Sequence, residues 1–397
     1  MGTTMLPSGS RELDGSATPK LVEARAVVPS LERAPTTQAV RVADLALGWV
    51  EQGYVPDAVI RRGIRRLNGR RRADLSLGDC ETAAERVERF VREMDDGDIA
   101  PVPHLANEQH YEVPAELFAL VLGPRRKYSS CWWPAGVETL AAAEDAALAE
   151  TCARADVAGG QEILELGCGW GSLTLWMAEH HPTSRITGVS NSASQRAWIE
   201  REARARGLDN VRVITADMNS FAIADRFDRV VSVEMFEHMR NWRALFARVH
   251  GWLRPGGKFF LHVFCHRAVP YAFLDEGPAD WMSRHFFSGG IMPSDDLPSR
   301  FQDRLRLVSR WRWDGRHYAR TAEAWLENLD RCREQVLPLL ALAYGADQAT
   351  LWLQRWRIFF MACAELFGHA GGQEWWVSHS LFERPRDAAS DRDRELA

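Results

Sequence analysis

Short apolar segments alternate with helical patterns through the middle of the chain. The apolar runs that predict strands lie at residues 162–166, 185–189, 211–215, 229–233 and 258–264. Helices are expected to begin near Ser172, Ser192, Arg243 and Thr321, and two later strands are expected at residues 305–313 and 375–382. Strands that alternate with helices are typical of an α/β fold, in which helices cover both faces of a mostly parallel sheet.

The segments on either side of this region have a different composition. Residues 1–38 are rich in Ser, Pro, Thr and Gly and predict a disordered tail, and the Asp-rich residues 385–397 predict a second one. Between the first tail and the sheet, residues 39–125 predict a helical region, because apolar residues such as Ile60 and Ile64 recur at helical steps.

Seven arginines lie between Arg61 and Arg72 in this helical region. They could bind phosphates or an anionic membrane surface. They could equally form a solvated helix face whose side chains lie over the core, which is the interpretation we favour.

Composition and charge exclude several classes of protein. The net charge is −5 and the isoelectric point is near 6.2, so no nucleic-acid partner is expected. The seven cysteines show no CxxC spacing, so we expect reduced thiols and no metal site. No apolar run approaches the roughly 18 residues of a membrane span, and the first residues lack the apolar region of a signal peptide. These features predict a cytoplasmic protein.

The most informative motif joins the first predicted strand to the helix after it. An apolar strand that contains Glu165 leads into a turn with glycines at Gly167, Gly169 and Gly171. Glycines allow a tight turn and let a ligand approach bare main chain. The spacing differs from GxGxxG and from GxxxxGK[ST], so neither a dinucleotide nor a triphosphate is the expected ligand.

This E-x-G-x-G-x-G form resembles the first motif of class I S-adenosylmethionine-dependent methyltransferases. The resemblance implies a Rossmann-like doubly wound sheet whose last strand is antiparallel, with S-adenosyl-L-methionine as cofactor and S-adenosyl-L-homocysteine as product. It also implies that Glu165 supports the loop or the cofactor. Cofactor contacts further along the chain are implied at Asn191, Gln195, Asp217 and Met218. Taken alone, Asp217 could simply cap a turn.

A second motif, VEMFEHM, follows the fourth predicted strand and contains Glu234, Glu237 and His238. If a helix starts here, the three side chains share one face, because residues three and four apart are neighbours. An amine with a pKa of about 10.4 is mostly protonated at pH 7, and a carboxylate or imidazole could take its proton. The alternative is a charged helix N-terminus with no chemical role.

Several longer segments resemble the coclaurine N-methyltransferase family. They include NEQHYEVP from Asn107, KYSSC from Lys127, LGCGWGSLTL from Leu166, VEMFEHM, FFSGG from Phe286 and GRHYA from Gly315. The resemblance implies a methyltransferase domain over residues 126–384, with a substrate cap built from insertions at about 267–304 and 314–373. It implies N-methylation of a small benzylisoquinoline or tetrahydroisoquinoline-like amine, and leaves a homodimer open.

The same resemblance assigns residues to roles. Glu237 and His238 are implied as catalytic residues, with Glu234 also facing the amine. Tyr111, Trp356 and Phe359 are implied as the substrate wall, and Tyr128 and Ser129 as further cofactor contacts.

The related cyclopropane fatty acid synthases provide the alternative function, which is modification of unsaturated lipid chains and would involve membrane contact. Those enzymes use a bound bicarbonate, whose implied neighbours are Glu237, His262 and Tyr318. The cysteine position of the synthases falls on Ser130, with Cys131 one place later as a small buried thiol. This departure from the synthase pattern favours amine methylation.

Overall fold

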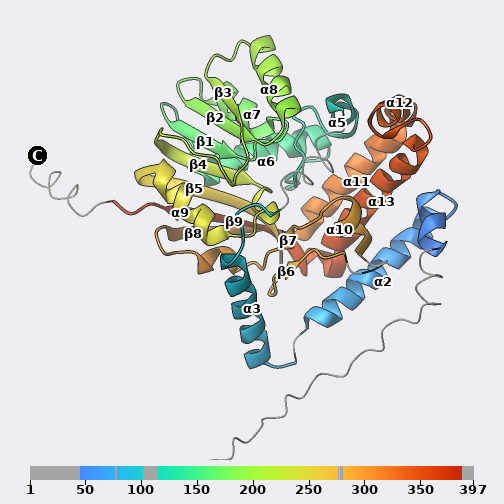
Figure 1. The fold of residues 1–397 in the computed structure, drawn as a ribbon. Helices are drawn as coiled ribbons and strands as arrows, with labels where there is room; N and C mark the ends of the chain where they lie inside the picture. Colours follow the sequence, from blue (N-terminus) through green and yellow to red (C-terminus); the bar gives the residue numbers. More distant parts are fainter. Residues whose placement is uncertain (1–44, 77, 102–113, 276, 278–279, 387–397) are drawn as a thin grey trace, which may run out of the picture. The chain divides into compact units, whose positions relative to one another are not determined.

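The computed structural model describes residues 45–76, 78–101, 114–275, 277 and 280–386. Its centre is a seven-stranded sheet with the order β3-β2-β1-β4-β5-β9-β8 (Figure 1). The strands are β1 (Glu162–Leu166), β2 (Arg185–Ser190), β3 (Val211–Thr215), β4 (Phe227–Val233), β5 (Leu253–His266), β8 (Arg306–Trp313) and β9 (Trp375–Glu383). A separate pair is formed by β6 (Tyr271–Ala272) and β7 (Ile291–Met292).

Strand direction matches the predicted fold class. The neighbours from β3 to β5 are parallel, whereas β9 runs antiparallel to both β5 and β8. The last strand in the sequence is therefore the antiparallel one, and it lies inside the sheet. The apolar residues of β1 and β4 are largely buried, as expected for strands covered on both faces.

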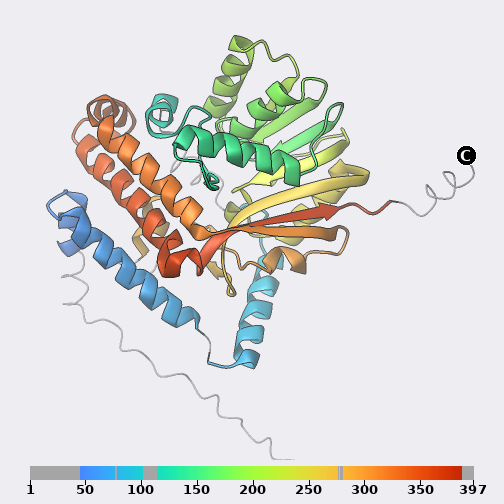
Figure 2. The ribbon, with the colours of Figure 1, turned by 180° about the vertical axis from the view of Figure 1, so that it is seen from behind.

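Helices cover both faces of the sheet. On one face α6 (Leu140–Arg154) and α7 (Ser172–His180) pack residues such as Leu148 and Leu173 against Ile163. On the other face α9 (Trp242–Trp252) packs in one cluster with Leu164 and its neighbours, and the C-terminal end of α3 (Cys80–Asp95) packs on α9. Figures 1 and 2 show these two layers from opposite sides. The helix α8 (Ala193–Ala205) follows β2.

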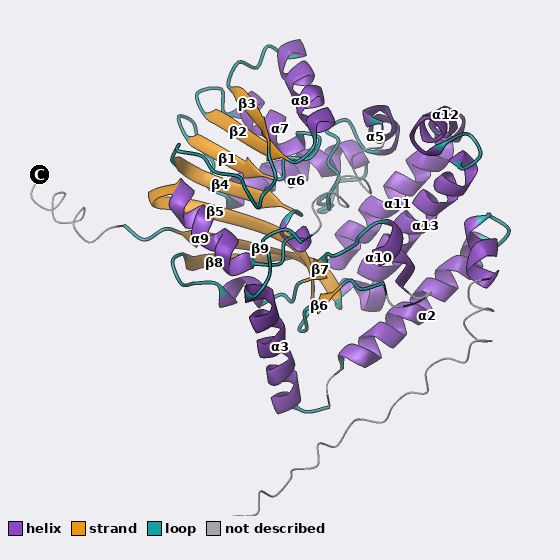
Figure 3. Ribbon diagram, in the orientation of Figure 1, coloured by secondary structure: helices purple, strands orange, loops and turns teal. Residues whose placement is uncertain are grey.

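A second group of helices meets the carboxyl ends of the strands. In Figure 3 the strands and these helices form two distinct regions. The helices are α2 (Asp57–Leu75), α5 (Ala115–Val121), α10 (Trp281–His285), α11 (Gly315–Arg331), α12 (Arg333–Tyr344) and α13 (Ala349–Phe367). Short 3₁₀ turns are η1 (Phe236–His238), η3 (Leu297–Arg300) and η4 (His369–Gly372).

The helix expected near Thr321 begins six residues earlier, at Gly315, so that prediction is wrong. Asp314 caps the helix by accepting a hydrogen bond from the Arg316 N–H at 2.8 Å. A Cβ at Gly315 would lie 2.1 Å from the Trp375 carbonyl oxygen, so only glycine fits where α11 meets β9. This close approach depends on a distant segment and has no local sequence signal.

Two of the seven arginines between Arg61 and Arg72 form ion pairs that connect α2 to the neighbouring helices. The Arg61 guanidinium donates to both carboxylate oxygens of Glu323 on α11, at 2.6 and 2.7 Å, and to Glu365 on α13 at 3.2 Å. Arg65 also pairs with Glu365, at 3.1 Å. For these two residues the structure supports the packing interpretation.

Among the described residues, no single helix has both the length and the apolar character of a membrane span, although the bent pair α12 and α13 meets both criteria jointly. The predicted tail 1–38, most of the C-terminal tail and Tyr111 lie outside the described residues. The domain boundaries therefore stay predictions.

Candidate active site

The glycine-rich turn after β1 contains three glycines. One of them borders open space, and at the other two a neighbouring side chain leaves no room for a Cβ atom. Gly167, Gly169 and Gly171 all have positive φ angles, of 75°, 51° and 80°. A Cβ at Gly167 would lie 2.5 Å from the Met235 side chain, and one at Gly171 would lie 2.6 Å from Ile199. A Cβ at Gly169 would meet nothing within 4 Å, so this is where a ligand can approach the main chain.

Two adjoining cavities open beside this turn. They span about 740 and 580 Å³ of atom-free space, open solvent at their mouths included, and share Gly167, Gly169, Gln195 and Glu234 in their walls. The first is also lined by Asn191, Asp217, Met218 and His238, and the second by Tyr128, Ser129 and Glu165. Every residue predicted to contact the cofactor therefore lines a cavity, except Gly171.

The polar atoms in these walls fit an S-adenosylmethionine molecule. Gln195 is buried, and its Oε1 accepts a hydrogen bond from Ser190 at 2.6 Å. Its Nε2, the Trp170 indole N–H and the Ser172 hydroxyl have no hydrogen-bond partner among the described residues. A buried donor without a partner costs about 1–3 kcal/mol. The carboxylate and hydroxyl groups of the cofactor are suitable acceptors for these donors.

Glu165 and Asp217 have structural contacts as well as a place in the cavity walls. The Thr174 hydroxyl on α7 donates a short hydrogen bond to the Glu165 carboxylate, which supports the loop as expected. Burial raises the pKa of Glu165 to about 8. Asp217 accepts a hydrogen bond from the Asn219 N–H at 2.8 Å, so it caps a turn and also lines the cavity.

Glu234 stands directly after β4, in a left-handed backbone conformation with φ of 50° that is uncommon for a residue with a side chain. Its Oε1 accepts a hydrogen bond from the Ser130 N–H at 2.9 Å and lies 3.1 Å from the His262 Nε2. Its Oε2 accepts a hydrogen bond from the Tyr318 hydroxyl at 2.8 Å. Burial raises the pKa of Glu234, while the Lys127 charge and the donors from Ser130 and Tyr318 oppose that rise.

No α-helix starts at Glu234, so the condition for Glu234, Glu237 and His238 to share one helix face is not met. Only one 3₁₀ turn, Phe236–His238, forms after the left-handed residue. His238 lines the first cavity and stacks on Phe287, with 4.4 Å between ring centroids. Glu237 is fully buried and lines neither cavity.

The Glu237 carboxyl lies outside the walls of both cavities and contacts the main chain of β5. Its Oε1 accepts a hydrogen bond from the Phe264 N–H at 2.8 Å, and its Oε2 has no partner among the described residues. Burial and the nearby Glu234 raise the pKa of Glu237 well above its usual range. Of the three predicted catalytic residues, Glu234 and His238 therefore line the cavity walls and Glu237 does not.

The residues expected around a bicarbonate contact a carboxylate of the chain itself. His262 and Tyr318 are brought to Glu234 and not to Glu237, so the predicted grouping is only partly right. Ser130 contributes its main-chain N–H to the same carboxylate. Cys131 is fully buried, as expected of a small buried thiol, and its N–H donates to Thr321 at 3.1 Å.

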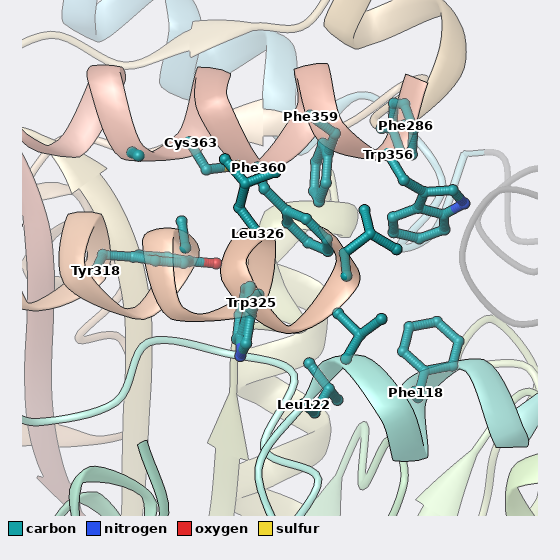
Figure 4. Packing of buried hydrophobic residues seen from close by; sticks show 14 of the residues in the cluster. Phe118, Leu122, Phe286, Tyr318, Trp325, Leu326, Trp356, Phe359, Phe360 and Cys363 are labelled. Carbon is teal, nitrogen blue, oxygen red and sulfur yellow. The ribbon is translucent and has the colours of Figure 1, made fainter. Parts of the chain in front are cut away.

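The predicted substrate wall lies in an aromatic cluster between helices. Phe359 stacks on Phe286 with 4.4 Å between centroids, and Trp356 meets Phe286 edge-on at 5.1 Å. Figure 4 shows side chains of α5, α11 and α13 pointing toward one another in this cluster. Neither Trp356 nor Phe359 lines either cavity, so their role as a substrate wall stays a prediction.

Two buried residues at the site were not singled out from the sequence. The Lys127 ammonium donates to the Ser129 hydroxyl at 2.6 Å and to the Ser130 carbonyl at 2.5 Å. It adjoins predicted cofactor contacts and is one of only three lysines in the chain, which is a usable signal. His379 is hydrogen-bonded to His262 at 2.9 Å. No local signal marks it, because a sequence does not display the register between strands.

Comparison with known proteins places the chain among methyltransferases and related enzymes. The profile of the family described as mycolic acid cyclopropane synthetase matches residues 103–373. An (S)-coclaurine N-methyltransferase of Thalictrum flavum subsp. glaucum is 36% identical over 345 residues, covering 84% of this chain and 94% of the relative. A cyclopropane-fatty-acyl-phospholipid synthase of Escherichia coli K12 is 30% identical and covers 70% of this chain and 68% of the relative.

Solved structures agree with this placement. A coclaurine N-methyltransferase bound to N-methylheliamine and S-adenosylhomocysteine aligns with a TM-score of 0.81 and 32% identity. The alignment covers 87% of this chain and 99% of that one. The mycolic acid cyclopropane synthase CmaA1 aligns with a TM-score of 0.59 at 22% identity, which supports the shared fold.

Proposed function

We propose that this chain, which belongs to the coclaurine N-methyltransferase family of S-adenosylmethionine-dependent methyltransferases, methylates the nitrogen of a benzylisoquinoline or tetrahydroisoquinoline-like amine. The relatives named above act on (S)-coclaurine or bind N-methylheliamine, and both names describe small amines. The observation that carries the proposal is the Glu234 carboxylate, which three donors hold at the wall shared by the two cavities.

The residues around the glycine-rich turn would hold the cofactor. Gly169 admits it against the main chain, and Gln195 and Trp170 offer it buried donors. Once bound, S-adenosylmethionine supplies an electrophilic methyl group on its sulfonium sulfur. The chain must then present the amine nitrogen with its lone pair free.

Glu234 is suited to receive an ammonium group. Its Oε1 already faces two partners, whereas its Oε2 accepts one hydrogen bond and has a second lone pair available. Burial raises the pKa of this carboxyl, which makes it a stronger base than an exposed glutamate. His238, on the wall of the first cavity, offers an imidazole for the same proton. Positioned base catalysis typically contributes about 10²–10⁴ in rate.

A second candidate function is modification of unsaturated lipid chains. It is favoured by the family profile and by the Escherichia coli relative. A synthase that needs bicarbonate requires room for that anion between His262 and Tyr318. In this structure the Glu234 carboxylate contacts both side chains, so the chain supplies its own carboxylate there.

One experiment separates the two candidates. Purified protein and S-adenosylmethionine are incubated in parallel with tetrahydroisoquinoline amines and with unsaturated phospholipid vesicles, and products are read by mass spectrometry. We expect one methyl group on the amine nitrogen, with no dependence on added bicarbonate. A bicarbonate-dependent methylene gain on lipid, with no amine product, would reject the proposal.

Three further expectations accompany the proposal. A cytoplasmic location and a homodimer stay predictions, and membrane contact is expected only under the second candidate. Within the part of the chain that the structure describes, no group of three His, Cys, Asp or Glu side chains could hold a metal ion.

A further inference from the structure

A row of buried hydrogen bonds extends from Glu234 into the sheet, and the proposed function does not use it. The Glu234 Oε1 is 3.1 Å from the His262 Nε2, and the His262 Nδ1 is 2.9 Å from the His379 Nε2. The His379 Nδ1 is in turn 2.8 Å from the Arg154 Nη1. We propose that Arg154 and His379 are positioning residues, which fix the tautomer of His262 and thereby keep the Glu234 carboxylate ionised and oriented. This inference rests on the proposed function, in which Glu234 meets the amine.

The direction of the row follows from the chemistry of arginine. A guanidinium can only donate hydrogen bonds, so the His379 Nδ1 must accept one from Arg154. A neutral His379 then carries its proton on Nε2 and donates to the His262 Nδ1. His262 in turn carries its proton on Nε2 and donates it to Glu234. Every hydrogen bond therefore points toward the carboxylate.

Both imidazoles are held neutral. His262 and His379 are fully buried, and burial lowers the pKa of each well below its usual value. The charges of Arg154 and Lys127 lower both pKa values further. Among the described residues, the carboxylate that contacts His262 is Glu234, and His379 contacts none. With one proton on each ring, the tautomer at His379 dictates the tautomer at His262.

The fold holds each member of the row in place. His262 on β5 and His379 on β9 are directly paired across the antiparallel ladder. Arg154 is the last residue of α6, where a cation complements the helix dipole. Its guanidinium lies over the Trp311 and Trp313 rings, at 5.3 and 5.6 Å from their centroids, and its Nε donates to Glu150 at 2.7 Å.

The arrangement differs from ordinary core packing in a testable way. Two imidazoles that served only to fill the sheet could be exchanged for apolar groups of similar shape at little cost. Two imidazoles that set the charge state of Glu234 could not, because loss of His262 removes a donor from an ionised oxygen and loss of His379 leaves the tautomer of His262 unfixed. A glutamine at position 379 would preserve the direction, since its carbonyl oxygen can accept from Arg154 while its amide donates to His262.

The test compares His379→Leu with the matched variant His379→Gln. A hydrogen bond to an ionised group is worth about one pH unit or more in the pKa of its acceptor. In His379→Leu the His262 side chain remains, but it is free to carry its proton on Nδ1, and in that tautomer it donates nothing to Glu234. We therefore expect the acidic limb of kcat against pH, at saturating amine and cofactor, to move up in His379→Leu, by at most about one pH unit. His379→Gln should retain the wild-type midpoint. The other titratable groups that interact with Glu234 are the same in both variants, and they include Lys127, Tyr318, Glu237, Cys131 and Cys363.

A spectroscopic readout tests the row without any substrate. In protein with ¹⁵N-labelled histidine, His262 and His379 should both show the neutral Nε2–H form. His379→Leu should lose the single tautomer of His262, and His379→Gln should keep it. S-adenosylhomocysteine binding and thermal unfolding report whether each variant is folded.

The outcomes are separable. A protonated or Nδ1–H His262 in the wild-type protein overturns the inference, whether or not a variant folds. Equal kcat midpoints in His379→Leu and wild type overturn it as well. Absence of methyl transfer from wild-type protein to any amine defeats the proposed function alone, because the tautomer measurement still decides the present inference.

Discussion

The carboxyl ends of the strands and the helical layer beside them are built in opposite ways. At the strand ends, polar and glycine residues line two cavities, and buried donors such as the Gln195 amide lack a partner among the described residues. In the helical layer, aromatic side chains such as Trp356 and Phe359 fill the space between α5, α11 and α13 with one another. The first region is prepared for a polar ligand, whereas the second is packed as a core. Four variants test this contrast.

The largest effect is expected at the carboxylate that joins the two regions. Glu234→Gln should lower kcat by about 10²–10⁴ while cofactor affinity changes little, because an amide cannot take the proton of an ammonium. Steady-state kinetics and S-adenosylhomocysteine titration measure the two quantities. The control is Glu237→Gln, which we expect to stay within about tenfold of wild type, because that carboxyl lines neither cavity and burial raises its pKa, which favours the neutral form that glutamine resembles. A collapse of kcat in Glu237→Gln would restore to Glu237 the catalytic role that the family resemblance implies.

Gly169→Val should fail at binding and not at chemistry. Its side chain would enter the open space that the ligand needs, so S-adenosylhomocysteine affinity should fall by about 100-fold or more in a calorimetric titration. Gly207→Val is the matched control, because Gly207 also has a positive φ and open space around it but lines neither of these two cavities. If both variants bind the cofactor equally, the cavity beside Gly169 is not its site.

A smaller effect is expected in the aromatic cluster. If the helical layer opens to hold the amine, Phe359→Leu should raise the KM for the amine about two- to tenfold, since an aromatic contact is worth about 0.5–1.5 kcal/mol. Its kcat should change little. Phe360→Leu, a neighbour in the same cluster, is the control and should leave KM unchanged. Equal KM values for the two variants would show that Phe359, like Phe360, only packs in the core and does not contact the amine.

The last prediction concerns stability and not catalysis, at the loop support Glu165, whose pKa burial raises to about 8. The folded protein keeps a proton that the unfolded chain loses above about pH 4.3, so the stabilisation present below that pH is lost as pH rises toward the folded pKa. Between about pH 5 and 7.5, the wild-type free energy of unfolding should fall by about 1.4 kcal/mol per pH unit relative to Glu165→Gln. Urea denaturation without cofactor measures this slope. Parallel slopes for the two proteins would contradict the expected proton uptake.

The same contrast explains which features could be predicted from the sequence. The strands β1 and β3 and the glycine-rich turn follow from short local patterns, so the sequence predicts their positions closely. The residues predicted from the same patterns to contact the cofactor line the two cavities, except Gly171. The start of α11 depends on Gly315 meeting β9, and the burial of Glu237 depends on a single 3₁₀ turn. These features arise from contacts between distant segments, and a local pattern cannot display them.

The position of β9 also determines when the protein can become active. It is the last strand that the structure describes, yet it lies between β5 and β8, and it places His379 beside His262, the imidazole that contacts Glu234. Synthesis proceeds from the N-terminus, so β8 has no neighbour in the sheet until residues 375–383 have been made. A chain released before that point lacks both the strand that joins the sheet and the imidazole behind its carboxylate. Premature termination would therefore leave an incomplete product with a gap in its sheet, and not a shorter working enzyme.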